Sequence, residues 1–201
     1  MRVMAGLVVA GTLLGLPARA EEPYGLPLAG EEAEAFLRTA EVVEKKGLGI
    51  GITRSERLTL SDGTRTHRAV WKTIDEFKRG LTRLEGGGVI VDFADSWKFE
   101  VAAYELDKLL SLSLVPPTVE RTLHRTTGSL QLWVERAMTE ADRKQKNIRP
   151  PDPASWNDQM YKVRLLHQLT YNTDARNIRT VLFDPSFRIY AVDFSRAFAA
   201  Y

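Results

Sequence analysis

Residues 171–198, YNTDARNIRTVLFDPSFRIYAVDFSRAF, combine a polar loop with two short apolar runs. Residues 180–183 and 187–192 are rich in β-branched and aromatic side chains, which favour strands. The sequence Asp-Pro-Ser at 184–186 separates these runs and is typical of a turn. The segment therefore predicts a β-hairpin that follows an irregular loop.

Acidic and amide side chains stand at both ends of this predicted hairpin. Asp174 and Asn177 lie in the loop before it, and Asp193 follows its second strand. Phosphoryl-transfer enzymes place one carboxylate beside the accepting hydroxyl and another on the Mg²⁺ that neutralises the phosphates. The pattern fits that chemistry, and it also fits aspartates that only shape turns.

A lysine closes an apolar strand in the first half of the chain. Residues 50–53, 57–60 and 66–74 predict a three-stranded meander, with a hairpin turn at the Asp-Gly pair 62–63. Lys72 ends the run Ala-Val-Trp-Lys in the last of these strands. Such a lysine either faces solvent from the open side of the sheet or meets an acidic partner.

The next helix offers that partner. Asp95 or Ser96 can cap its start. At about 100° per residue, Glu100 falls on the flank of the apolar face, from which its carboxylate can reach Lys72, whereas Glu105 falls on the opposite flank. The apolar face consists of residues at three- and four-residue spacing: Phe99, Ala102, Ala103, Leu106, Leu109 and Leu110.

Three glycines lie at the start of the predicted meander. Because glycine lets backbone N–H groups approach phosphate oxygens closely, Gly47, Gly49 and Gly51 are candidate phosphate ligands. The same glycines would also serve simply to end a helix and begin a strand.

The glycine-rich segment, the strand lysine, the helix glutamate and the two aspartates follow one another in an order that resembles the protein-kinase-like superfamily. The likeness is greatest to its atypical branches, namely HipA-like kinases, phosphoinositide kinases and secreted Golgi-type kinases. As in those branches, the third residue of the Asp-Phe-Gly signature is replaced, here by Ser195. The resemblance implies that Lys72 holds phosphates, Glu100 positions Lys72, Asp174 is the catalytic base and Asp193 binds Mg²⁺.

The resemblance also implies an adenine site and a cofactor. The predicted hairpin of residues 119–124 and 128–135 leads to an inter-lobe hinge in which Leu132 and Glu135 would meet the base. The expected ligand is ATP or another nucleotide with Mg²⁺ or Mn²⁺, and the acceptor stays unidentified. Kinases usually carry a metal-binding asparagine five residues after the catalytic aspartate, whereas this chain has Asn177 at three and Arg179 at five. A pseudokinase, or an envelope binding or scaffold protein without turnover, is therefore the alternative.

The expected architecture is an α+β, two-lobed, kinase-like fold. It comprises an N-terminal antiparallel sheet with a helix and a short C-terminal lobe. The predicted divisions are a signal peptide, an N-terminal extension with a helix, the N-lobe and a reduced C-lobe: residues 1–20, 21–46, 47–135 and 136–201. We further predict helices at 31–46 and 155–170, the latter with Met160, Val163, Leu166 and Leu169 inward, and loose connections at 75–93 and 136–152.

The first twenty residues have the composition of a secretory signal peptide. Arg2 precedes an apolar run that is too short for a comfortable membrane span, and Ala-Arg-Ala at 18–20 resembles a cleavage site. An uncleaved N-terminal anchor is the alternative. We therefore expect a secreted or periplasmic protein with no stable membrane span after cleavage.

Composition narrows the possible functions. Loss of Arg2 and Arg19 with the signal peptide changes 28 basic and 26 acidic residues to 26 of each, so charge does not favour nucleic acid as a partner. The chain has no cysteine, which excludes disulfides and thiol catalysis. Its three histidines, His67, His124 and His167, are too widely spaced in sequence for a zinc motif.

Overall fold

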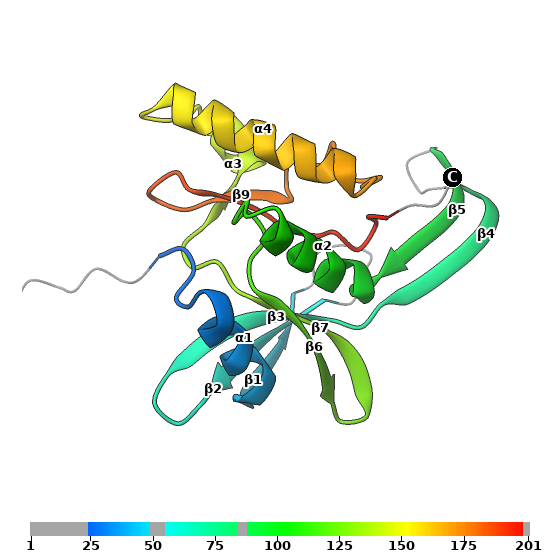
Figure 1. Cartoon of the computed structure of the whole chain (residues 1–201), viewed down its shortest axis with the longest axis vertical. Helices are drawn as coiled ribbons and strands as arrows, with labels where there is room; N and C mark the ends of the chain where they lie inside the picture. Colours follow the sequence, from blue (N-terminus) through cyan, green and yellow to red (C-terminus); the bar gives the residue numbers. More distant parts are fainter. Residues whose placement is uncertain (1–23, 49–54, 84–87, 199–201) are drawn as a thin grey trace, which may run out of the picture.

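The computed structural model describes residues 24–48, 55–83 and 88–198. They form an α+β structure with antiparallel sheets and several helices (Figure 1). The signal-peptide segment, Gly49, Gly51 and the predicted strand at 50–53 lie outside the described residues, so these expectations stay predictions. No helix of the described part is long and apolar enough to cross a membrane.

The largest sheet has five antiparallel strands in the order β1-β2-β3-β7-β6. Leu58 lies opposite Ala69 where β2 meets β3, so the predicted hairpin turn at 62–63 is confirmed. The second predicted hairpin is also confirmed, because β6 pairs directly with β7. The strand bounds are Glu41–Gly47 (β1), Glu56–Ser61 (β2), Thr66–Lys72 (β3), Thr118–Leu123 (β6) and Thr126–Leu132 (β7).

Two helices, α1 (Gly30–Thr39) and α2 (Trp97–Leu109), pack on β6 and β7. Glu34 of α1 joins them, because its carboxylate accepts hydrogen bonds from Tyr104 Oη at 3.0 Å and Lys108 Nζ at 2.8 Å, both on α2. Beneath α1 the first core cluster forms from Leu28, Ala33, Phe36, Leu37, Ala40, Leu58, Leu60, Ala69, Trp71, Val119, Leu130 and Leu132.

A second core cluster lies between α2, α4 and a small sheet. That sheet has the order β10-β9-β8, and the predicted hairpin is confirmed, since Phe183 of β9 pairs with Ile189 of β10. In Figure 1, α4 lies at the far end of the molecule from α1, and α2 lies between them. The elements are β8 (Met138–Thr139), α3 (Glu140–Gln145), α4 (Pro153–Leu169), β9 (Val181–Phe183) and β10 (Ile189–Ala191).

The helix predicted for 31–46 is wrong in its second half. The helix ends at Thr39, and the following residues form β1. Two adjacent β-branched valines begin that strand, and β-branched residues favour strands. Its charged side chains then find partners across the strands instead of along a helix, with Lys45 bound to Glu56 and Glu44 bound to Thr59 on β2.

The connections predicted as loose contain regular structure. Residues 75–93 include β4 (Asp75–Arg83) and most of β5 (Val89–Ser96), which form a separate two-stranded hairpin that projects from the body (Figure 1). Leu81 and Val91 pair across this hairpin, and both side chains are exposed. Because neither face of the hairpin is buried here, the sequence does not show the alternation that predicts a half-buried strand. Residues 136–152 include β8 and α3.

The buried faces of the two long helices differ from those predicted. On α2 the buried residues are Trp97, Glu100, Ala103, Tyr104 and Asp107, while Leu109 is 80% exposed. The helix is nevertheless capped as expected, because the Ser96 side chain accepts the Lys98 N–H at 3.3 Å.

The α4 face is only partly as predicted. Val163 and Leu166 are buried and Met160 is partly buried, but Leu169 is exposed. Trp156 and His167 supply the other buried side chains. The periodicity of aliphatic residues thus predicted Leu169 as buried and missed the two buried rings, the indole of Trp156 and the imidazole of His167.

Gly128 is required where β7 passes the end of β3. A Cβ at this position would overlap the carbonyl oxygen of Lys72 and touch Trp71 and Thr73. We expect Gly128→Ala to lower the free energy of unfolding by about 1–3 kcal/mol, because the backbone oxygen cannot yield as a flexible side chain would.

Denaturant unfolding measures this effect, with Gly47→Ala as the matched control. A Cβ at Gly47, also on a strand of the same sheet, meets nothing within 4 Å. The control should change stability by less than about 0.5 kcal/mol. Equal stability of the two variants would contradict the close approach of β7 to Lys72.

Candidate functional site

Three charged side chains from distant parts of the chain meet between the two core clusters. Lys72 Nζ lies 2.5 Å from Glu100 Oε1 and 2.7 Å from Asp193 Oδ1. The expected ion pair of Lys72 and Glu100 is therefore present, and Asp193 joins it. We call these three residues the charged cluster.

Each member of the charged cluster is fixed by a different element. Lys72 is the last residue of β3 and pairs with Ser129 of β7. Glu100 lies in the first turn of α2, and Asp193 follows β10. The cluster thus joins the large sheet, the helix above it and the end of the small sheet.

Burial is unequal within the charged cluster. The Glu100 side chain is 2% exposed and that of Lys72 is 12% exposed, whereas that of Asp193 is 41% exposed. Glu100 is therefore at the centre of the buried face of α2, and its predicted position on the flank is wrong. Because Asp193 is open to solvent, a ligand that arrives from outside would meet Asp193 first.

The close contacts set the pKa values of the cluster. Burial alone would lower the pKa of Lys72, but the carboxylates of Glu100 and Asp193 raise it above its usual value. Burial raises the pKa of Glu100, and the Lys72 ammonium offsets this only in part. Partial burial would raise the pKa of Asp193, yet Lys72 holds it below its usual range. Lys72 is therefore firmly cationic and Asp193 firmly anionic at neutral pH.

The backbone of Asp193 is in an unusual conformation. Its φ is +65°, in the left-handed region that side chains with a Cβ rarely adopt. Two neighbouring contacts hold it: the Phe194 N–H donates to Glu100 Oε2 at 3.0 Å, and Ser195 Oγ donates to Asp193 Oδ1 at 3.3 Å. Such outliers cost about 1–3 kcal/mol and persist where surrounding structure enforces them, often at functional sites.

The loop of Asp174 packs against the segment that follows Asp193. Thr173 donates to the Arg196 carbonyl from both its N–H and its hydroxyl, each at 3.2 Å. Val192 N–H donates to the Thr180 carbonyl at 2.9 Å. The structure therefore brings the two predicted acidic sites together through their backbones.

Asn177 is engaged within its own loop. Its Nδ2 donates to Asp174 Oδ2 at 2.9 Å, and its Oδ1 accepts the Arg179 N–H at 3.1 Å. Asn172 Oδ1 accepts the N–H of Asp174 at 2.9 Å. The sequence suggested that Asn177 binds a metal ion. To do so, its Oδ1 would have to coordinate the ion in addition to accepting the Arg179 N–H.

His167, which belongs to no zinc motif in the sequence, is buried beside the site. Its ring stacks on Phe194 with centroids 5.1 Å apart, and its Nδ1 lies 3.1 Å from the amide nitrogen of Asn172. It thus touches the residue after Asp193 and the residue that orients Asp174. Burial lowers its pKa, which Asp174 offsets only in part. Its position in the last turn of the helix before Asp174 was the available signal.

The candidate base-binding residues have partners in this structure. Gly25 exchanges both backbone hydrogen bonds with Glu135, at 2.9 and 2.8 Å, and the carboxylate of Glu135 binds Arg68. The Leu132 N–H donates to the Pro117 carbonyl at 2.8 Å. A base that used the Glu135 backbone would therefore have to displace Gly25.

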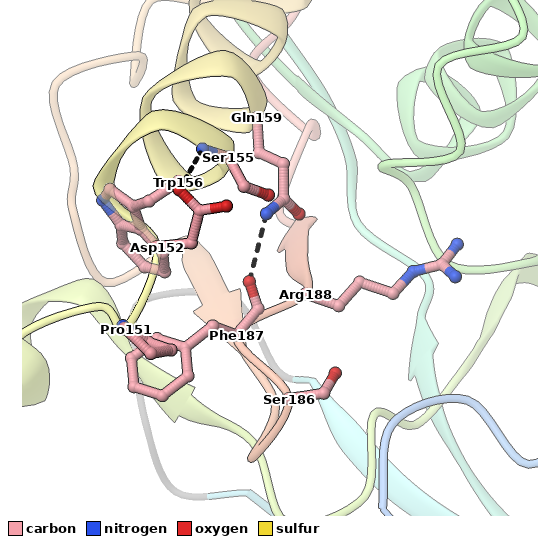
Figure 2. A pocket seen from close by; sticks show the side chains of 8 residues that line it. All are labelled: Pro151, Asp152, Ser155, Trp156, Gln159, Ser186, Phe187 and Arg188. Atoms are coloured by element: carbon pink, nitrogen blue, oxygen red, sulfur yellow. Dashed lines mark hydrogen bonds between the residues drawn. The ribbon is translucent and has the colours of Figure 1, made fainter.

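A separate pocket of about 300 Å³ lies at the other end of α4 (Figure 2). Its polar groups are largely engaged: Asp152 caps the helix, and Gln159 donates to the Phe187 carbonyl at 3.1 Å and accepts the Ile189 N–H at 2.8 Å. The 17 residues of α4 place it about 25 Å along the helix from the Asp174 loop. This pocket is thus distinct from the charged cluster.

At the charged cluster, a metal ion would find few ligands in the described part of the chain. Among the described residues no group of three or more histidine, aspartate or glutamate side chains is arranged to hold a metal ion. Mg²⁺ commonly takes one or two carboxylates and fills its remaining positions with phosphate oxygens and water. Asp193 fits that limited role, because its carboxylate is anionic and exposed.

No family model matches the sequence, and comparison with curated proteins finds no significant match. Functional inference for this chain therefore rests on the geometry of the charged cluster and its surroundings.

We expect Glu100→Gln to lower the free energy of unfolding by about 1–3 kcal/mol. Glutamine can still accept the Phe194 N–H, but it leaves Lys72 with one carboxylate in place of two. Glu100→Ala should cost about 3–5 kcal/mol, because it removes a partner of a buried ion pair. Denaturant unfolding measures both.

Glu105→Gln is the matched control for Glu100. Glu105 is on the same helix and forms an exposed pair with Lys108, so its replacement should cost at most about 1 kcal/mol. If both glutamine variants had the stability of the wild type, the buried pair would be absent in solution.

The pKa of His167 predicts a pH dependence of stability. Its folded-state pKa lies below the usual 6.5 because the ring is buried, so the unfolded chain binds the proton at a higher pH than the folded chain does. This contribution to stability is present above pH 6.5 and is lost as the pH falls below it. We expect the loss of stability between pH 7.5 and 5.5 to be smaller in His167→Gln than in wild type.

Unfolding free energies at several pH values between 7.5 and 5.5 test this expectation. His124→Gln controls for the loss of a histidine, since His124 is exposed. The same pH slope in wild type and His167→Gln would show that His167 is not buried in its neutral form.

Proposed function

We propose that the chain binds a nucleoside triphosphate with Mg²⁺ or Mn²⁺ in a kinase-like site and transfers a phosphoryl group to an unidentified acceptor. The observation that carries the proposal is the placement of Lys72 Nζ between Glu100 and Asp193, at 2.5 and 2.7 Å. In protein kinases a strand lysine, a helix glutamate and a metal-binding aspartate must be in place together.

The charge of the site supports a cationic ligand. Lys72 and Arg196 are the cations in contact with the carboxylates of Glu100, Asp193 and Asp95. These five groups sum to one excess negative charge. A desolvated excess charge is costly unless a counterion meets it, and the exposed carboxylate of Asp193 is the accessible place for one.

The arrangement of elements supports a two-lobed, kinase-like interpretation of the α+β fold. The five-stranded sheet and α1 form one core cluster, whereas α2, α4 and the β9–β10 hairpin contribute to the other. The charged cluster lies where the two meet, because Lys72 belongs to the sheet and Asp193 follows β10. Substrates bound between two such bodies would be accessible to residues of both.

Each residue would have a separate task in the transfer. When bound, the divalent cation would neutralise negative charge on the transferred phosphoryl group. Asp193 would hold that cation, and Lys72 would turn from Asp193 towards phosphate oxygens while Glu100 keeps its ammonium in place. Asp174 would orient the acceptor hydroxyl and accept its proton while the acceptor oxygen bonds to the terminal phosphorus and the nucleoside diphosphate leaves. Asn177 Nδ2 and the hydrogen bond from the Asp174 N–H to Asn172 would fix the loop.

Binding without turnover is the second candidate function. Two observations favour it: Asn177 makes hydrogen bonds inside its own loop, and Gly25 binds the Glu135 backbone groups expected to meet the base. Such a protein would still use the charged cluster for a nucleotide or another anionic ligand. It would lack the transfer step that requires Asp174.

Calorimetric titration of ATP with and without Mg²⁺ or Mn²⁺ tests the proposal. We expect Asp193→Ala to abolish the metal-dependent part of binding, since it removes the cation's carboxylate. Asp174→Ala should leave binding within about threefold of wild type and abolish any phosphoryl transfer, because binding does not use its carboxylate.

The control is Asp158→Ala, which removes an exposed aspartate paired with Lys162 on α4. It should bind as wild type does. If wild type shows no metal-dependent binding of any nucleoside triphosphate, the proposed function is wrong. If Asp174→Ala and wild type bind equally and neither transfers phosphate to water or protein, the second candidate is correct.

A further inference from the structure

The β5–α2 junction contacts the segment after Asp193 at successive residues. Ser96, which ends β5 and caps α2, donates its N–H to the Ser195 carbonyl at 2.8 Å. The adjacent residue, Asp95, lies 3.4 Å from the Arg196 Nε through its Oδ2. The two segments therefore run past each other in a defined register.

Asp95 is a buried carboxylate with an incomplete set of partners. The residue is 2% exposed, and its Oδ1 is fully buried with no hydrogen-bond partner in the described part of the chain. Arg196 supplies the positive charge that faces it. A buried carboxylate needs such a charge, so Asp95 draws Arg196 towards β5.

Arg196 is held on a second side by an aromatic ring. Its guanidinium carbon lies 5.4 Å from the ring centroid of Phe93, which is also on β5. The planar guanidinium can thus stack on Phe93 while its Nε faces Asp95. Sequence reasoning had assigned residues 75–93 to a loose connection, so it had no partner for Arg196 on this side.

The residues between Asp193 and Arg196 also contact the β5–α2 unit. Two residues separate Asp193 from Arg196 along the chain, and of these the Phe194 N–H and the Ser195 carbonyl are both bonded to the β5–α2 unit. Asp193 itself has the left-handed φ of +65°, which needs support from its surroundings. Phe194, Ser195 and Arg196 are therefore three consecutive residues that contact the β5–α2 unit.

We propose that Asp95 and Arg196 are a pair of positioning residues that hold Asp193 beside Lys72 in its left-handed conformation. The inference rests on the proposed function for its consequence, the cation affinity of Asp193, but its structural part can be measured without any ligand. Neither residue needs to touch a substrate. The β4–β5 hairpin, which brings Asp95 to this place, is then part of the site.

Hydrogen exchange of backbone amides, followed by NMR on the full chain, tests the structural part. We expect Asp95→Asn and Arg196→Met each to raise the exchange rates of the Ser96 and Phe194 amides at least tenfold. These amides bond to the Ser195 carbonyl and to Glu100, respectively. The Leu114 amide, which bonds to Asp107 on α2, should keep its rate and corrects for any change in global stability.

Two further variants make the test specific. Arg196→Lys keeps a positive charge that can face Asp95, and it should restore exchange to within about threefold of wild type. Lys98→Met removes the exposed partner of Asp75 at the base of the same hairpin and should leave both amides unchanged. If Arg196→Met does not fold, Asp95→Asn and Arg196→Lys still separate the outcomes.

Calorimetric titration of Mg²⁺ with ATP on the same proteins tests the consequence. Asp95→Asn and Arg196→Met should weaken the metal-dependent part of binding about tenfold, while Lys98→Met binds as wild type. Faster exchange with no metal-dependent binding in wild type would support the positioning pair and overturn the proposed function. Unchanged exchange rates of the Ser96 and Phe194 amides in folded Asp95→Asn and Arg196→Met would overturn the positioning pair. This holds whether or not the variants bind the nucleotide as wild type does.

Discussion

The burial of Glu100 beside Lys72 is the constraint on which the rest of this structure depends. A carboxylate that is 2% exposed must have a cation and hydrogen-bond donors, and the chain supplies them from β3 and from the Phe194 backbone. Satisfying one side chain therefore forces a sheet, a helix and the end of a second sheet to converge. Asp193 takes its place in the cluster as a result of that convergence, and its own carboxylate remains accessible.

The two core clusters depend on this convergence in different ways. The cluster under α1 is closed by apolar side chains and by the Glu34 contacts to α2. The cluster between α2 and α4 includes Phe194, which His167 covers from one side. Because α2 contributes to the boundary of both clusters, a shift of this helix would disturb the charged cluster and both cores together.

Much of the site could be predicted from sequence because it depends on local signals. Lys72 at the end of an apolar strand and Asp193 after a hairpin are visible in the order of residues, and in the structure the two side chains lie 2.7 Å apart. Long-range contacts gave no such signal. The burial of Glu100 and the pairing of Asp95 with Arg196 depend on partners far away in the chain. The strand β1 and the β4–β5 hairpin pair locally, but their largely exposed residues lack the alternation that marks a half-buried strand.

The strand-like contact between Gly25 and Glu135 has a mechanical consequence. After β7, where the chain continues towards the second core cluster, Glu135 pairs with Gly25 in an antiparallel bridge of two backbone hydrogen bonds. The connection there consists of two paired segments and not of one. Gly25 also packs against the side chains of Asp184 and Tyr190, which a Cβ at this position would crowd. The segment that contains Gly25 therefore also contacts the small sheet. Two paired strands resist bending and twisting more than one strand does, so this contact stiffens the connection between the two core clusters.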